Sequence, residues 1–177
     1  MKAAAFLAFA GLASAAAQAQ YTVQMNAIDI KGVGAPVGTV TLSEAPQGGG
    51  VVFKADLKGL PPGPHGFHVH EFANCGARAK DGKMSAGELA GGHWDPDKAG
   101  KHGSPAGGGH RGDLPPLVVG ASGAAQQEFK APRLKLADLR NKALVVHAGG
   151  DNHSDQPKPN GGGGDRIACG VIEGPKG

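Results

Sequence analysis

Alternating apolar and polar positions predict short β-strands along this chain. The clearest case is residues 51–57, where Val51, Phe53, Ala55 and Leu57 alternate with mostly polar residues. Successive side chains of a strand leave opposite faces, so this pattern predicts a half-buried strand with one apolar face. The other strand candidates are residues 38–42, 66–72, 143–148 and 166–172.

Two long segments between these strands have neither a helical nor a strand period. Residues 73–116 carry recurrent Gly and Pro, and residues 151–165 are polar and glycine-rich. Long segments without secondary structure in a small domain are commonly functional loops. The whole chain holds 32 Gly and 13 Pro without a collagen-like period, as is typical of many strands joined by turns. We therefore expect an all-β fold, with an antiparallel sheet and long functional loops.

Length and charge restrict the functions further. A chain of 177 residues with 40% hydrophobic content is long enough for one globular domain with a core. The formal net charge is only +3, and the Lys and Arg residues are scattered rather than gathered into basic runs. This distribution gives no support to nucleic-acid binding.

The first 19 residues are typical of a signal peptide. They begin with a cation at Lys2, continue as an alanine-rich apolar stretch, and end in the small-residue pattern Ala-Gln-Ala. The stretch is too short to span a bilayer, so we expect no membrane association of the mature domain, residues 20–177. The alternative interpretation is a buried N-terminal helix.

Export would place the two cysteines, Cys75 and Cys169, in an oxidising compartment where disulfides persist. We therefore expect them to be paired. They do not form a C-x-x-C motif, which argues against a thioredoxin-like redox pair and against a zinc ribbon.

Histidines are the strongest chemical signal, since eight occur in this short chain. His68 and His70 lie two residues apart in a predicted strand, so both imidazoles leave the same face and can reach one ion. Other candidate ligands are His93, His102, His110 and Asp113 in the irregular segment and His147 at the end of an apolar strand. Imidazole with carboxylate and without thiolate suits copper and zinc. The residue types thus indicate a divalent metal site.

Six sequence blocks stand in one order along the chain. They are residues 66–71 (GFHVHE), 92–96 (GHWDP), 101–105 (KHGSP), 109–114 (GHRGDL), 146–147 (VH) and 166–170 (RIACG). Their order and spacing resemble the copper,zinc superoxide dismutase family across nearly the whole mature chain. Residues 81–84 (DGKM) and the loop that begins at His147 are similar to the bacterial exported branch. The resemblance implies an eight-stranded Greek-key β-barrel or sandwich with long metal-binding and electrostatic loops.

The resemblance also implies a ligand set, assigned here residue by residue. The implied copper ligands are His68, His70, His93 and His147. The implied zinc ligands are His93, His102, His110 and Asp113, so that His93 bridges the two ions. Asp151 matches a carboxylate that accepts hydrogen bonds from His68 and His102, and Cys75 and Cys169 match the family disulfide. His65 and His153 match no ligand position and are left out of the predicted site.

The implied activity is conversion of superoxide to dioxygen and hydrogen peroxide by cycling of a copper ion bridged to zinc. Arg166 matches the arginine that guides and docks the anion, and His93 would be both ligand and proton relay. Asp165 stands where the family usually has a small uncharged residue, and we expect it to slow capture. The alternative function is an exported copper- and zinc-binding protein on the same fold without turnover. The retained copper ligands and Arg166 favour the enzyme.

Location and assembly are less determined by the sequence. The signal peptide and the bacterial branch predict a periplasmic protein, with secretion into the medium as the other destination. Monomer and homodimer both stay open, because no interface can be read from periodicity.

Overall fold

The computed structural model describes residues 19–174. The expected signal peptide, residues 1–19, lies outside this range except for its last residue. Within the described range the regular secondary structure is β-strand apart from short 3₁₀ turns, as predicted. The strands are β1 (Gln20–Asp29), β2 (Gly32–Glu44), β3 (Val51–Leu57), β4 (Gly63–His65), β5 (Phe67–His70), β6 (Arg78–Lys80), β7 (Lys83–Ser85), β8 (Leu117–Val119), β9 (Ala125–Ala131), β10 (Lys142–His147) and β11 (Arg166–Ile172). Short 3₁₀ turns are η1 (Pro46–Gly48), η2 (Glu88–Ala90), η3 (Leu136–Leu139) and η4 (Asn160–Gly162).

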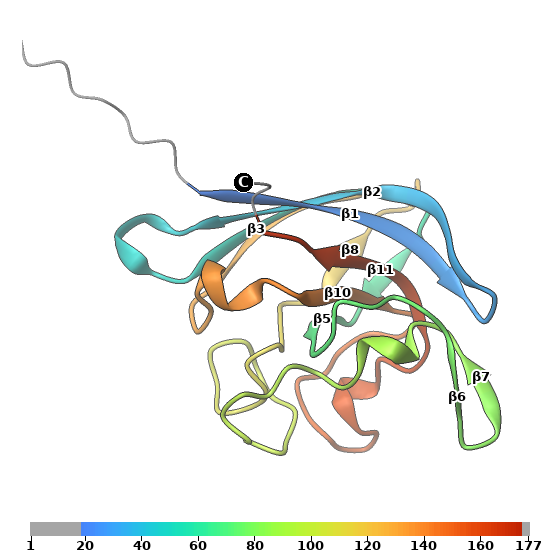
Figure 1. The fold of residues 1–177 in the computed structure, drawn as a ribbon. Coiled ribbons are helices and arrows are strands. Elements are labelled where there is room, and N and C mark those ends of the chain that lie inside the picture. Colours follow the sequence, from blue (N-terminus) through green and yellow to red (C-terminus); the bar gives the residue numbers. More distant parts are fainter. Residues whose placement is uncertain (1–18, 175–177) are drawn as a thin grey trace, which may run out of the picture.

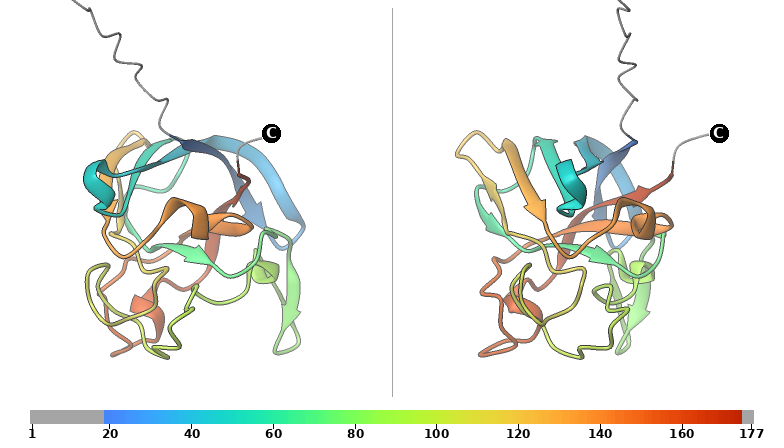
Figure 2. Two further views of the ribbon diagram at one scale, coloured as in Figure 1. Left: turned by 60° about the vertical axis from the view of Figure 1, so that its left-hand side comes forward. Right: turned by 90° about the vertical axis from the view of Figure 1, so that its left-hand side faces the viewer.

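One curled antiparallel sheet forms most of the molecule, with the strand order β5-β10-β11-β1-β2-β3-β9 (Figures 1 and 2). β4 is separated from β5 by Gly66 alone, and β4 pairs with β8. If β4 and β5 are counted as one interrupted strand, eight strands surround the core. Between β8 and β9 the side chain of Gln127 forms the link, because it bonds Val118 N at 3.0 Å and Pro116 O at 3.1 Å. The predicted eight-stranded architecture is confirmed.

The connections give the Greek-key order, because β3 leads on to β5 and β9 leads on to β10 although neither pair is adjacent in the sheet. The two longest loops, residues 71–116 and 148–165, lie together on one side of the barrel (green to yellow and orange to red in Figures 1 and 2). The first loop contains the small β6–β7 hairpin, which the sequence did not predict. The barrel thus presents one side that two loops cover together.

Strand alternation builds the core. The apolar face of β3 is buried as predicted, with Val51, Phe53, Ala55 and Leu57 each at most 2% exposed. β5 departs from simple alternation, since all of its residues are buried. Its phenylalanine and valine join the core, and its histidines face the two covering loops. β5 therefore separates the apolar core from a polar site.

Candidate metal centre

Backbone hydrogen bonds hold two loop segments against β5. Val69 N donates to Gly112 O at 2.9 Å, Trp94 N donates to Val69 O at 2.8 Å, and Gly112 N donates to Trp94 O at 2.8 Å. These bonds place His93 opposite His70 and Asp113 opposite His68. A side chain at Gly112 would collide with Val69 O, so this close approach requires glycine. Residues far apart in sequence are thereby brought to one face of β5.

The first cluster consists of four buried histidines, His68, His70, His93 and His147. Each is at most 8% exposed, and the candidate ligand nitrogens all lie within 4.8 Å of one another. His70 Nε2 is 3.3 Å from His147 Nε2, and the rings of His68 and His93 stack with centroids 3.9 Å apart. Four imidazoles at this spacing suit a copper ion.

Hydrogen bonds orient three of these rings by occupying one nitrogen of each. His70 Nδ1 donates to Gly91 O at 3.0 Å, and His147 Nδ1 donates to Gly164 O at 3.1 Å. His68 uses Nε2 instead, which donates to Asp151 Oδ2 at 2.7 Å. Because a neutral imidazole carries one N–H, the other nitrogen keeps its lone pair for a metal. The available atoms are therefore His70 Nε2, His147 Nε2 and His68 Nδ1.

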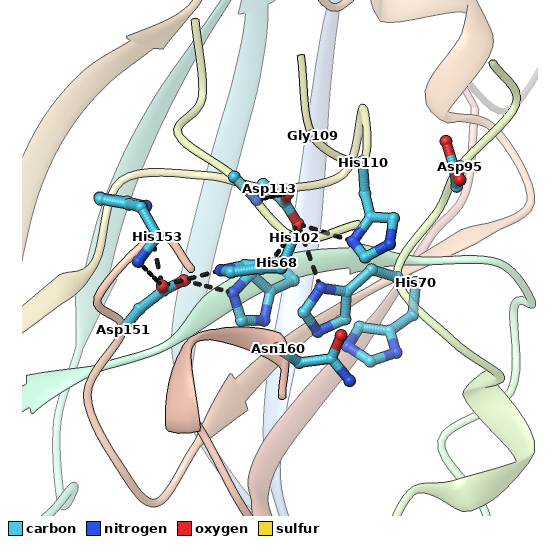
Figure 3. A network of polar contacts seen from close by, with 12 residues as sticks. His68, His70, Asp95, His102, Gly109, His110, Asp113, Asp151, His153 and Asn160 are labelled. Atoms are coloured by element: carbon cyan, nitrogen blue, oxygen red, sulfur yellow. Dashed lines mark hydrogen bonds and ion pairs between the residues drawn. The ribbon is translucent and has the colours of Figure 1, made fainter. Parts of the chain in front are cut away.

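The second cluster converges on one carboxylate oxygen, Asp113 Oδ1 (Figure 3). The Nδ1 atoms of His93, His102 and His110 lie 3.1, 3.0 and 3.4 Å from it. Asp113 Oδ2 accepts a bond from Gly103 N at 2.9 Å, which fixes the carboxylate. Three imidazoles and one carboxylate are a suitable zinc ligand set.

Unpaired nitrogens show that the two clusters fit metal ions. His68 Nδ1, His102 Nδ1 and His110 Nδ1 are buried and have no hydrogen-bond partner of acceptable geometry. A buried polar atom without a partner costs about 1–3 kcal/mol, so native proteins rarely leave several together. Here each of the three faces one of the two clusters, where a metal ion would satisfy it.

His93 stands between the clusters. Its Nδ1 faces Asp113 in the second cluster, and the same residue belongs to the first. His68 also lies close enough to belong to both groups, but its Nε2 is already bonded to Asp151, so it has only Nδ1 to offer. The two nitrogens of an imidazole point in different directions, and His93 can therefore face two ions at once.

Asp151 joins the two clusters from behind. Its Oδ1 accepts from His102 Nε2 at 2.8 Å, as its Oδ2 does from His68 Nε2, and the carboxylate is fully buried (Figure 3). Asp151 Oδ1 also accepts the backbone N–H of His153 at 2.7 Å. Gly161 has φ +72°, and a side chain there would collide with Asp151 Oδ1. The carboxylate orients one histidine of each cluster.

Burial determines the charge state of the first cluster. It lowers the pKa of His68 and His70 well below the usual value, and it lowers the pKa of His147 to about 3. The pKa of His93 is also lowered by burial, although the hydrogen bond to Asp113 opposes the shift. Neutral imidazoles at neutral pH are the form that binds metal ions.

The two carboxylates near His102 oppose the effect of burial on its pKa. Burial by itself would lower the pKa of His102, but its close contacts with the carboxylates of Asp113 and Asp151 outweigh it and raise the pKa to about 9. For the same reason the pKa of each carboxyl group lies well below its usual range despite burial. Without a bound ion, the second cluster therefore holds positively charged His102 between two carboxylates. A metal ion bound there would supply the positive charge in place of the proton.

A cleft of about 590 Å³ leads from solvent to the histidines, and its lining includes His93, His147 and Arg166. Arg166 is held by two carbonyl groups, with Nη1 2.6 Å from Gly87 O and Nη2 2.7 Å from Gly91 O. Its guanidinium has five N–H donors, so others stay available to an anion in the cleft.

The disulfide predicted from the sequence is present. Cys75 in the first loop is bonded to Cys169 in β11, with Cα atoms 5.7 Å apart. Cys169 lies three residues after Arg166, and the loop that it anchors carries Gly87 and Gly91. The disulfide thus ties the arginine and its carbonyl partners to the same part of the barrel.

Comparison with known proteins decides the family. The family model for copper/zinc superoxide dismutase (SODC) matches residues 36–172. The chain belongs to this family. The Cu-Zn superoxide dismutase of Escherichia coli (strain K12) is 54% identical over 163 residues, covering 92% of this chain and 93% of that protein.

Solved superoxide dismutases have the same fold. The Cu/Zn superoxide dismutase from Brucella abortus has a TM-score of 0.84 and 50% identity, covering 87% of this chain and 99% of that one. The monomeric copper, zinc superoxide dismutase from Salmonella enterica has a TM-score of 0.78 and 52% identity, covering 88% of this chain and 100% of that one.

The structure brings together every site residue predicted from the sequence. His110 lies slightly apart, since the tighter group of ligand atoms contains His68, His93, His102 and Asp113. His65 lies under the site, with ring nitrogens 2.7 Å from His147 O and 2.8 Å from Pro61 O. The sequence did not reveal Glu88, which approaches Arg166, or the grouping of His153 with Asp151 and His102. The spacing of His153, two residues after Asp151, was the available signal.

Proposed function

We propose that this protein is an exported superoxide dismutase with copper on His68, His70, His93 and His147, and with zinc on His93, His102, His110 and Asp113. The observation that carries the assignment is the position of His93. One nitrogen faces the carboxylate cluster, and the ring also belongs to the all-histidine cluster. The ligand types agree, because the copper set is imidazole only and the zinc set includes a carboxylate.

Copper, when bound, supplies the one-electron chemistry that converts superoxide to dioxygen and hydrogen peroxide, whereas zinc keeps one oxidation state. The chain supplies docking and protons. Arg166 offers N–H donors to the small anion beside His93 and His147 in the cleft. When His93 Nε2 is not bound to a metal, this atom can carry a proton and donate it to the reduced product.

Charged side chains of both signs line the cleft: Arg78, Lys80 and Arg166 are basic, and Glu71, Glu88 and Asp165 are acidic. Lys80 and Arg166 both line it, and Glu88 lies between them, 3.4 Å from Lys80 Nζ and 3.8 Å from Arg166 Nη2. Positive groups at an entrance raise the encounter rate of a negative substrate. Asp165 lines the same cleft and has the opposite effect on the local potential. We infer that Asp165 moderates capture.

The periplasm is the proposed compartment. The signal-peptide pattern of residues 1–19 and the disulfide both suit an oxidising compartment outside the cytoplasm. Among the described residues, no helix is long and apolar enough to cross a membrane. Cell fractionation with N-terminal sequencing tests this proposal; protein that stays in the cytoplasm with Met1 retained would contradict it.

Assembly is a separate question from activity. One solved relative, from Salmonella enterica, is described as monomeric. Monomer and homodimer both stay open for this chain, and sedimentation velocity over a range of protein concentrations will distinguish them.

The deciding experiment measures superoxide dismutation by protein loaded with copper and zinc, with zinc-loaded, copper-free protein as the reference. We expect activity that depends on copper and is abolished in His147→Ala, while that variant still binds one zinc ion. Lys54→Gln, on the exposed side of β3, is the matched control and should keep full activity. Protein that binds both metals and stays inactive would instead establish the alternative function, metal binding without turnover.

A further inference from the structure

His153 lies on the solvent side of the second cluster and takes no part in the proposed ligand sets. Its ring is nearly parallel to that of His102, with centroids 6.5 Å apart and an interplanar angle of 17°. The side chain is 31% exposed, yet its Nδ1 atom is buried and has no hydrogen-bond partner. His153 thus connects solvent with the interior of the site.

The unpaired nitrogen of His153 points toward other metal-binding groups. His153 Nδ1 is 3.7 Å from Asp151 Oδ1, too far for a hydrogen bond. One ligand atom each from His102, Asp151 and His153 lies within 4.8 Å of the others. Imidazole with carboxylate is a suitable donor set for a borderline divalent cation such as Zn²⁺.

The backbone at His153 is unusual. Its φ is +57°, in the left-handed region that non-glycine residues rarely adopt. The hydrogen bond from its own N–H to Asp151 Oδ1 helps to hold this conformation. Such conformations cost about 1–3 kcal/mol and persist where the surrounding structure imposes them, which is common at functional sites.

We propose that His153, Asp151 and His102 form an outer position at which Zn²⁺ is captured before it passes to the inner zinc site. The inference rests on the proposed zinc ligands, because His102 is shared by the two positions. Its Nε2 faces Asp151, and its Nδ1 faces Asp113. The two nitrogens of one ring therefore serve the outer and the inner position.

The shared histidine makes the outer position temporary. An ion held there displaces the proton from His102 Nε2 to solvent and replaces the hydrogen bond to Asp151. Once an ion is bound at Nδ1, Nε2 regains a proton and donates to Asp151 again. The outer position is favoured while the inner one is empty, because a second ion on the same ring would have to remove the last ring proton of His102 and break its bond to Asp151. This is the property of an entry point and not of a third permanent site.

The test is the rate of Zn²⁺ uptake by metal-free protein, followed by stopped flow with a chromophoric zinc chelator. In His153→Asn the amide is too short to reach the ion, and Asn tolerates a positive φ. We expect uptake to slow about tenfold, the lower end of the effect of losing a group next to a metal site. Equilibrium zinc affinity should stay unchanged, because the inner ligands are intact, so release must slow by the same factor.

Two further variants separate the explanations. His153→Phe keeps a flat ring beside His102 without a ligating nitrogen, and it should be as slow as His153→Asn. Gln156→Asn, an exposed position in the same loop, should take up zinc at the wild-type rate. Normal uptake in either His153 variant would overturn the proposal, whatever the rate of release. Failure of the wild type to hold zinc at the inner site would refute the ligand assignment itself. The number of zinc ions bound per protein at equilibrium distinguishes this failure from a failure of the outer position.

Discussion

Replacement of Asp151 by Asn tests how the loop ligands are positioned. The carboxylate accepts bonds from His68 Nε2 at 2.7 Å, from His102 Nε2 at 2.8 Å and from His153 N at 2.7 Å. An amide has one oxygen and one NH₂ group, so in either orientation an N–H faces an N–H of a histidine. At least one of the two imidazole bonds must be lost.

The two histidines respond differently to this loss. His68 lies in β5, where pairing with β10 keeps the backbone in place. His102 lies in a loop and is held mainly by Asp151, Asp113 and the bond from its own N–H to Asp155. We therefore expect the zinc site to weaken more than the copper site.

The magnitude follows from the hydrogen bonds. One bond to a charged group contributes about 1.5–3 kcal/mol to stability. Loss of a group that orients a metal ligand typically lowers metal affinity about 10–100-fold, which corresponds to about 1.4–2.7 kcal/mol. Asp151→Asn should thus lower zinc affinity within this range, with a smaller decrease for copper.

Equilibrium competition with a chromophoric chelator measures both affinities. Asp138→Asn makes the same chemical change at an exposed carboxylate in η3 and should bind both metals normally. Unchanged zinc affinity in Asp151→Asn would refute the positioning role of Asp151. A copper affinity that falls more than the zinc affinity would refute the distinction between strand-borne and loop-borne ligands.

Three further predictions concern charge, the disulfide and pH. Asp165→Asn should speed dismutation at low ionic strength because it removes a negative charge beside the cleft, and Arg166→Gln should slow it because it removes a positive one. Equal rates for Asp165→Asn and wild type in a salt series would contradict this expectation. Cys75→Ser opens a loop that spans 94 residues of sequence separation. It should lower the free energy of unfolding by about 4–5 kcal/mol in the chain-entropy model, and an unchanged urea midpoint would be incompatible with that value. Metal-free protein should be most stable near pH 6.5. Below pH 6.5 stability falls, because His147 takes up a proton in the unfolded chain but stays neutral when buried, with a pKa of about 3. Toward pH 9 stability falls as well, because His102, with a pKa of about 9 in the folded protein, loses the charge that stabilises it. Thermal unfolding across the pH range checks this, and stability that keeps rising from pH 6.5 to 9 would contradict the contribution of His102.

Local patterns determined a large part of the fold. The predicted strands at residues 51–57 and 166–172 coincide with β3 and β11, because large apolar residues mark the buried face. β1 was missed although Tyr21, Val23 and Met25 are buried in alternation. β9 was missed for a clearer reason. Its ends carry only alanine toward the core and its remaining residues are mostly polar, so its alternation is weak in the sequence.

The sequence by itself determined which ligand types are present and which can share a face. Two histidines two residues apart in a strand must point the same way, and this holds without knowledge of the fold. Family resemblance extended the set to the loop residues.

Only the tertiary structure decided which nitrogen of each ring is available. The carbonyl groups of Gly91 and Gly164 take up one nitrogen of His70 and His147, and Asp151 takes up one of His68. The grouping of His153 with Asp151 and His102 was decided in the same way. Each of these contacts to His70, His147 and His68 joins residues at least 17 positions apart. A local pattern cannot report such contacts, because they form only when the loops fold back over β5.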